Sequence, residues 1–174
     1  MILSHLCTRE APLLSILRRE LALSSGLVKR LKWQNALLLN GVPVHTNARV
    51  RPGDRVTVDL SETVVGYEGE DVPLDILYED ECCLAVDKPR GMLVHPSPQR
   101  NSGTLANAVL GYYQRTGQAC GVPPVTRLDR DTFGVVLFAK NAYIHEKFCE
   151  MQKKHLISKT YHASVYGTKM ASAG

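Results

Sequence analysis

The sequence predicts an α+β protein, in which two short helices and a small basic sheet precede a second part with a mixed, mainly antiparallel sheet. Apolar residues recur at helical spacing in four segments, each beginning at a proline or at a residue that caps helices. Short apolar or alternating runs between these segments are typical of strands. The helices and strands follow no regular β-α-β rhythm, which favours the α+β class.

The first two predicted helices lie in the first third of the chain. One begins at Pro12, because a proline N–H would have no partner in the first helical turn anyway, and Ser24 or Ser25 caps the other. Their apolar faces consist of Leu13, Leu14, Leu17 and Leu21 in the first helix and of Leu27, Val28 and Leu31 in the second. Each helix can therefore cover a core with one face.

A small sheet is predicted after these helices. Asn40 and Gly41 separate two apolar runs and predict a hairpin turn, because both residues accept positive φ. Residues 49–54 are typical of a turn, and residues 55–60 alternate as a half-buried strand does.

An acidic stretch divides the chain. Residues 61–75 contain five acidic and no basic side chains, so we expect a first domain at 1–62, an acidic linker at 63–73 and a second domain at 74–174. Strands are predicted there at 84–86, 92–94, 134–139 and 157–166. Thr104 and Asn141 each cap a helix. The inward residues are Leu105, Val109 and Tyr112 in the first of these helices and Ile144, Phe148 and Met151 in the second.

Positive charge is concentrated in the first third of the chain. Residues 1–60 hold nine basic and four acidic side chains, whereas residues 61–174 hold twelve and thirteen. This asymmetry indicates a module that binds a polyanion, joined to a nearly neutral body. A solvated basic face on a small domain explains the charge alone equally well.

Composition excludes several classes of protein. Five cysteines without C-x-x-C spacing do not match a disulfide scaffold or a zinc site, and His95 has no partner at metal-ligand spacing. The first residues are too short for a secretory leader, and no apolar run approaches the ~20 residues of a membrane span. We expect a cytoplasmic protein that is monomeric, holds no metal and contacts no membrane.

Residues 11–60 resemble the alpha-L RNA-binding module, a family named after a small-subunit ribosomal protein. The matching features are the basic second helix, the run LNGVPV at 39–44 and the run VRPGD at 50–54. The resemblance implies that cations on the second helix and the following hairpin meet the RNA backbone. The candidates are Lys29, Arg30, Lys32 and Arg49. The alternative is a surface helix with ordinary solvating charges.

The densest charged element is RLDRDT at residues 127–132. Arg127 and Arg130 flank Asp129, and nearby cations favour the ionised form of a carboxyl group. An ionised carboxylate in a cleft can act as a nucleophile. Taken by itself, the hexamer is more typical of a salt-bridged turn at the entrance to a strand.

Three motifs resemble the ribosomal-large-subunit family of pseudouridine synthases. Residues 78–96 are similar to its first motif, residues 126–140 to its catalytic motif and residues 159–161 to its third. They occur in the family's order behind an alpha-L module, a pairing that many members have. Such an ordered set is far more specific than one short match. A nucleotide-binding enzyme is disfavoured, since no glycine-rich loop follows a strand.

The resemblance implies a role for each of three residues. Asp129 matches the essential aspartate that attacks the uridine, and Arg127 matches the arginine that helps to flip the nucleotide out of the RNA. Tyr161 matches the tyrosine that packs on the flipped base and takes part in proton removal. Uridine and pseudouridine contain the same atoms, so we expect no cofactor. The implied partner is ribosomal RNA, with transfer RNA as the alternative.

The sequence departs from the family pattern in three ways. Thr126 stands where the family usually has His, and Phe133 where it usually has Ser. The family also continues well beyond its third motif, whereas this sequence ends in the polar stretch 168–174. We therefore expect a truncated synthase domain that is inactive or nearly so and marginally stable. The alternative is a non-catalytic RNA-binding protein.

Overall fold

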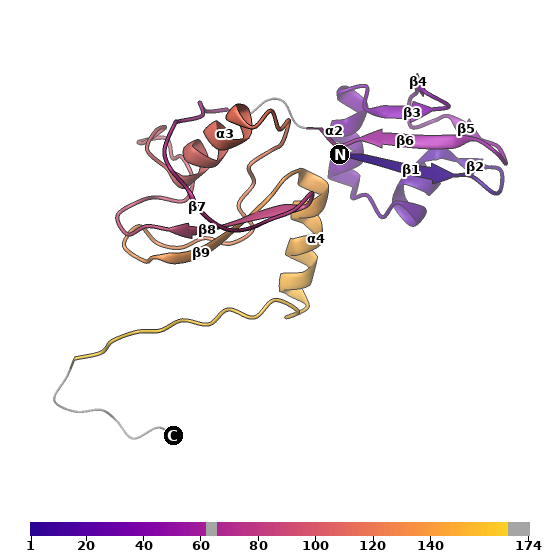
Figure 1. The fold of residues 1–174 in the computed structure, drawn as a ribbon. Helices are drawn as coiled ribbons and strands as arrows, with labels where there is room; N and C mark the ends of the chain where they lie inside the picture. Colours follow the sequence, from indigo (N-terminus) through magenta and orange to yellow (C-terminus); the bar gives the residue numbers. More distant parts are fainter. Residues whose placement is uncertain (62–65, 167–174) are drawn as a thin grey trace, which may run out of the picture.

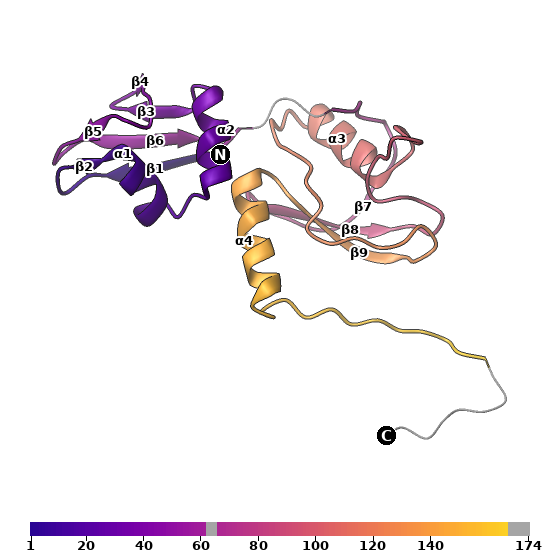
Figure 2. The same ribbon diagram turned by 180° about the vertical axis from the view of Figure 1, so that it is seen from behind.

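The computed structural model describes residues 1–61 and 66–166, and its elements form two groups (Figures 1 and 2). The first group contains β1 (Ile2–Leu6), β2 (Ala11–Pro12), α1 (Leu13–Ser15), the π-helical turn η1 (Ile16–Glu20), α2 (Ser25–Trp33), β3 (Leu37–Leu39), β4 (Val42–Pro43), β5 (Arg49–Val50) and β6 (Arg55–Asp59). The second contains β7 (Asp75–Glu79), β8 (Cys83–Lys88), α3 (Leu105–Arg115), β9 (Gly134–Ala139) and α4 (Ala142–Lys153). All of the paired strands are antiparallel, which confirms the α+β prediction.

An antiparallel sheet in the order β1-β6-β3-β4 forms the base of the first group, and β2 pairs with β5. Ser24 caps α2 as predicted, its hydroxyl oxygen accepting a hydrogen bond from the Leu27 N–H at 3.1 Å. Leu27 and Leu31 of α2 lie in one buried cluster with Val56 and Val58 of β6. The basic helix is therefore fixed on the sheet by its apolar face.

The predicted hairpin at Asn40 and Gly41 is confirmed. Their φ angles are 51° and 83°, and β3 pairs with β4 directly across them. The Asn40 side chain donates to the Asp54 carboxylate at 2.8 Å and accepts from the Arg55 N–H at 2.8 Å. The side chain of the turn residue thus ties the hairpin to the start of β6.

The first predicted helix is wrong in its geometry. Instead of one α-helix from Pro12 to Leu21, the chain forms three residues of α1 followed by the π-helical turn η1. The wider π turn changes which residues share a face. Ile16 is buried, whereas Leu14 is exposed.

A three-stranded sheet in the order β7-β8-β9 and the helix α3 form the second core (Figure 1). Leu84 of β8 lies opposite Phe138 of β9, and Val86 lies opposite Val136. The predicted cap of α3 is confirmed, because Thr104 and Asn107 form a capping box. All of these side chains are buried, so the strands and the helix have little freedom to shift.

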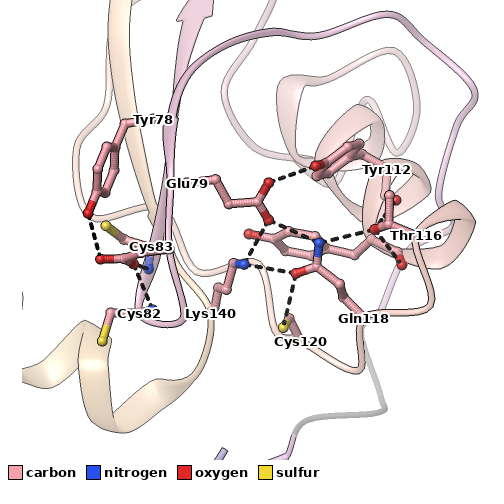
Figure 3. A network of polar contacts seen from close by, with 11 residues as sticks. Tyr78, Glu79, Cys82, Cys83, Tyr112, Thr116, Gln118, Cys120 and Lys140 are labelled. Atoms are coloured by element: carbon pink, nitrogen blue, oxygen red, sulfur yellow. Dashed lines mark hydrogen bonds and ion pairs between the residues drawn. The ribbon is translucent and has the colours of Figure 1, made fainter.

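A polar network closes the end of this core (Figure 3). The Lys140 ammonium donates to the carboxylate of Glu79 at 2.7 Å and to the side-chain oxygen of Gln118 at 2.8 Å. Tyr112 donates to the other Glu79 oxygen at 2.6 Å. Burial raises the pKa of Glu79, but these hydrogen bonds outweigh it and hold that pKa below its usual value. The network joins β7, α3 and the residue after β9.

Residues 68–71, within the expected linker, lie against α3. The Glu70 N–H donates to the Asn107 carbonyl at 2.9 Å, and the Glu70 carboxylate accepts from the Gly103 N–H at 2.8 Å. A Cβ on Gly111 would lie 2.1 Å from the Glu70 carbonyl oxygen, so α3 needs glycine at this crossing. The domain boundaries at 62 and 74 stay a prediction.

Two strands predicted in the second part are wrong. Residues 92–94 contribute one isolated bridge, between Leu93 and Thr104, and no strand. Residues 157–166 are neither helix nor strand and belong to none of the sheets. The predicted inward face of α4 is also wrong, since Met151 is exposed and no residue of this helix is fully buried.

The helix α4 instead lies beside the first group, as both views show (Figures 1 and 2). Ala142 and Tyr143 pack against the core of that group. The Ser24 hydroxyl donates to Glu146 at 2.7 Å, and Lys147 donates to the Ala22 carbonyl at 3.2 Å. The residue that caps α2 therefore also binds α4.

Candidate active site

Buried Lys88 lies at the centre of the region that carries two of the predicted motifs. Its ammonium donates hydrogen bonds to the carbonyl oxygens of Pro89, Met92 and Arg130, at 3.0, 2.8 and 3.0 Å. Burial lowers the pKa of Lys88, and the carboxylates of Asp131 and Asp129 oppose that shift. One charged group thus joins the turn after β8 to the segment that holds Asp129.

Further hydrogen bonds fix the same two segments, 89–92 and 127–133; we call the latter the Asp129 loop. The Gly91 N–H donates to the Arg130 carbonyl at 2.8 Å, and Arg130 Nε donates to the Gly91 carbonyl at 3.1 Å. Arg90 Nε donates to the Asp131 carbonyl at 3.1 Å. The backbone of the Asp129 loop is therefore held from one side at two consecutive residues, Arg130 and Asp131.

Residues 123–126 run along the edge of β9 and lead into this loop. The Val125 N–H donates to the Leu137 carbonyl at 2.7 Å, and the Thr126 hydroxyl accepts from the Leu137 N–H at 3.0 Å. Thr126, one of the departures from the family pattern, thus acts as a backbone partner in the structure. This hydrogen bond fixes the position of Thr126, the residue directly before Arg127.

Asp129 and Arg127 are both exposed on the loop. Within residues 1–61 and 66–166, neither side chain forms a hydrogen bond or an ion pair, and Arg130 binds the Gly91 carbonyl instead of Asp129. The expected pairing of Asp129 with its flanking arginines is therefore not formed. The alternative interpretation, a salt-bridged turn, is not formed either.

Two cavities flank the Asp129 loop. The first, which we call the Lys88 cavity, has a volume of about 670 Å³, and its wall includes Leu74, Asp87, Lys88 and Met92. The second, the Tyr161 cavity, has a volume of about 880 Å³ and lies between the Asp129 loop, β9 and residues 157–164. Arg90 and Phe133 line both cavities.

The structure brings Tyr161 near part of the predicted site. Tyr161 lines its cavity together with Thr126 and Leu128, the neighbours of Arg127 and Asp129. Neither Arg127 nor Asp129 belongs to the wall of either cavity. Tyr161 is exposed, on a segment without regular structure. The assignment of these three residues to one catalytic site stays a prediction.

Sequence reasoning missed the buried position of Lys88, although a signal for it exists. Leu84 and Val86 alternate inward along β8, and Lys88 is the next residue in the same register. A strand period of two therefore points the lysine into the protein. Its ammonium is buried only because three carbonyl oxygens surround it.

The predicted RNA-binding residues divide into two sets. Lys29, Arg30 and Lys32 are exposed together on α2. Arg49 lies on β5 and forms an ion pair with Glu10, with 3.1 Å between its Nε and the carboxylate oxygen. The basic face therefore consists of one helix, and Arg49 is engaged elsewhere.

Among the residues that the structure describes, no three His, Cys, Asp or Glu side chains cluster so that they could hold a metal ion. No helix among the same residues combines the length and the apolar character of a membrane span.

The fold and the motif positions agree with the comparison to known families. The pattern of the RNA pseudouridylate synthase family matches residues 83–173, which is about half of the chain. The chain belongs to this family. This match covers residues 83–96 of the first motif and the whole of the second and third motifs, together with Lys88 and the Asp129 loop.

Individual relatives extend the match into the first group. The chain is 35% identical over 166 residues to YhcT of Bacillus subtilis, an uncharacterised RNA pseudouridine synthase, covering 93% of this chain and 54% of the relative. It is 38% identical over 151 residues to YjbO of the same organism, covering 85% and 53%. It is 35% identical over 120 residues to ribosomal large subunit pseudouridine synthase D of Salmonella typhimurium, covering 68% and 37%.

These relatives are longer proteins. The chain spans about half the length of YhcT and YjbO, and just over a third of the Salmonella protein. The expected resemblance to the ribosomal-large-subunit family is confirmed, since a relative with that name matches the chain.

Proposed function

We propose that the protein isomerises uridine to pseudouridine in RNA, with large-subunit ribosomal RNA as the substrate class and transfer RNA as the alternative. Membership of the RNA pseudouridylate synthase family supports the reaction. The name of the Salmonella relative supports the class of RNA. We further propose that the protein acts as a monomer in the cytoplasm.

One observation carries the proposal. Asp129 is exposed and has no ion-pair partner among the described residues, while buried Lys88 holds the backbone of its loop. A carboxylate on a fixed loop, without a competing cation, can attack a substrate that is brought to it. Asp129 is therefore the proposed nucleophile.

The proposed reaction needs no cofactor, and the bond that the Asp129 carboxylate forms with the substrate breaks again before the product leaves. The bond between the sugar and a ring nitrogen breaks, the base rotates, and a new bond forms from the sugar to a ring carbon. That carbon loses its hydrogen as a proton, and the ring nitrogen gains one, so atoms and electrons balance. Arg127 is proposed to occupy the gap left by the flipped nucleotide, and Tyr161 to pack on the base and assist proton removal. Extrusion costs a few kcal/mol, which such contacts offset.

The first group is proposed to bind the RNA backbone. Lys29, Arg30 and Lys32 lie exposed on α2, where they can meet phosphates, and Arg49 is the fourth candidate. We propose the division into an alpha-L domain at 1–62, a linker at 63–73 and a synthase domain at 74–174. The contacts of α4 with Ser24 and Ala22 would then join the two domains.

Release of tritium tests the proposal directly. The protein in its full natural chain is incubated with RNA whose uridines carry tritium on the ring carbon that forms the new bond. We expect release from large-subunit ribosomal RNA and less from transfer RNA or an unrelated transcript. Absence of release from every RNA offered contradicts the proposed reaction.

A second candidate function is RNA binding without catalysis. It is favoured by the placement of Tyr161 and Asp129, which do not line a common cavity. This function predicts tight RNA binding together with no tritium release. The same assay, combined with a binding measurement, therefore distinguishes the two.

A further inference from the structure

Phe133 occupies an unusual position at the end of the Asp129 loop. Its side chain is 65% exposed, although large aromatic residues are usually buried. The Arg90 guanidinium lies 5.7 Å from the centre of its ring, within the range of a cation–π contact. Both residues line the Lys88 cavity and the Tyr161 cavity, so this pair is the wall that the two cavities share.

The pair is held in place by the backbone. Arg90 Nε donates to the Asp131 carbonyl at 3.1 Å, which fixes the guanidinium beside the loop that carries Phe133. The Gly91 N–H donates to the Arg130 carbonyl oxygen at 2.8 Å, and the Lys88 ammonium donates to the same oxygen at 3.0 Å. A ring and a cation fixed in this way lose little freedom when a ligand stacks on them.

The surroundings of the pair indicate the chemistry of the ligand. Arg127 and Arg130 are exposed on the same loop and provide positive charge for a phosphate backbone. Exposed aromatic rings next to arginines are the surfaces on which unpaired nucleobases stack in RNA-binding proteins. The ring lines both cavities, and these leave room beside it for a planar group.

We propose that Phe133, backed by Arg90, is a stacking platform for an unpaired nucleobase that neighbours the target uridine in the RNA. This inference rests on the proposed function and adds a residue that selects the context of the target. The platform favours an unpaired loop over a continuous duplex, because paired bases present only their edges. It is sequence-tolerant, since every base has a π face.

Binding to two matched RNAs tests this inference. One probe is a hairpin with an unpaired uridine-containing loop, and the other is a duplex of the same length and composition. Fluorescence anisotropy gives the dissociation constants for the unaltered protein and for Phe133→Ser. We expect the substitution to weaken hairpin binding about tenfold, the factor that loss of one base–aromatic stack produces, and to change duplex binding less than about twofold.

Two further variants separate stacking from a general loss of apolar surface. Phe133→Tyr keeps the ring and should bind the hairpin as the unaltered protein does. Leu77→Ser removes another exposed apolar side chain, 52% exposed on β7 and outside both cavities, and should leave both affinities unchanged. Since Phe133 and Leu77 are both exposed, neither substitution should impair folding.

The outcomes divide cleanly. If the unaltered protein binds the hairpin and Phe133→Ser binds it equally well, the platform is refuted while the proposed function stands. Equal weakening of hairpin and duplex by Phe133→Ser also refutes it. If the unaltered protein binds neither RNA, both the platform and the proposed function are wrong.

Discussion

The ammonium of Lys88 determines the shape of the candidate site more than any group expected to do chemistry. It binds three carbonyl oxygens from two loops in a buried position, where an unsatisfied polar group is costly. The residues with proposed chemical roles, Asp129 and Arg127, are exposed and form no such bonds with the part of the chain that the structure describes. Their positions therefore depend on the backbone that Lys88 holds.

Replacement of Lys88 by Met tests this dependence. Loss of the ammonium leaves carbonyl groups without partners, so we expect the free energy of unfolding to fall by about 1–3 kcal/mol. Displacement of the Asp129 loop should lower turnover about 100-fold, as small misplacements of catalytic groups do. Urea denaturation and tritium release measure the two effects. Lys154→Met, at an exposed lysine, is the control, and normal turnover by Lys88→Met would contradict the argument.

At the residue scale, the sequence supports some positions better than others. The motif resemblance predicts Asp129 as the nucleophile, which stays a prediction, and the strand register of β8 could have placed Lys88 inside. The contact between Arg90 and Phe133 could not be predicted, because 43 positions separate them in the chain and no local pattern links them. Such contacts depend on the tertiary arrangement of the two loops.

Among the elements, α2 combines a structural face with a charged one. Leu27, Val28 and Leu31 are buried, whereas Lys29 and Lys32 are exposed on the same helix. If the exposed face binds RNA, each phosphate contact releases counterions. The salt dependence of the RNA affinity can then be predicted.

We predict that Lys29→Ala combined with Lys32→Ala lowers RNA affinity at low salt and reduces the slope of log affinity against log salt by about 2. Anisotropy titrations across a series of salt concentrations measure this slope. The double variant Lys153→Ala with Lys154→Ala carries the same charge change and should keep the original slope. Equal slopes for the unaltered protein and the α2 variant would assign these lysines to ordinary solvation.

The network around Glu79 makes a prediction about pH. Its hydrogen bonds hold the pKa of Glu79 below the usual value despite burial. A lowered carboxyl pKa in the folded state stabilises the fold above the unfolded pKa of about 4.3, and this stabilisation disappears as pH falls through the folded value. Glu79→Gln should therefore cost about 2 kcal/mol at neutral pH and progressively less below about pH 4.

Urea denaturation between pH 3 and 8 measures this difference. Glu81→Gln, at the exposed neighbouring position, should lower stability little at any pH. A cost of Glu79→Gln that stays constant down to pH 3 would show that the carboxylate charge does not stabilise the network.

At the element scale, strong local patterns predicted the structure and weak ones did not. The caps Ser24, Thr104 and Asn141 and the Asn40 turn are confirmed, because each satisfies backbone groups locally. The strand β1 was not predicted, since its burial alternates only weakly and its five residues are fixed by pairing with β6. Pairing also decides the outcome at 157–166. A strand was expected there, but these residues pair with no described strand.

For the whole molecule, the main consideration is the length of the chain compared with that of its relatives. The chain spans about half of YhcT and YjbO, and residues 157–164 line the Tyr161 cavity without regular structure. We predict that a polypeptide of residues 1–174 has almost no turnover and low stability, because residues 157–166, which carry Tyr161, pair with no strand among the described residues. Tritium release and thermal unfolding measure these two properties. Robust turnover by this polypeptide would contradict the prediction.

The central claim is that Asp129 performs the chemistry while other residues hold the RNA. It is tested most directly by measuring tritium release and RNA affinity together for Asp129→Asn in the full natural chain. We predict that release falls by at least about 1,000-fold while the dissociation constant changes less than about twofold. Asp131→Asn, on the same loop, should keep turnover within about tenfold. Substantial release by Asp129→Asn, or a parallel loss of affinity and release, would contradict the account.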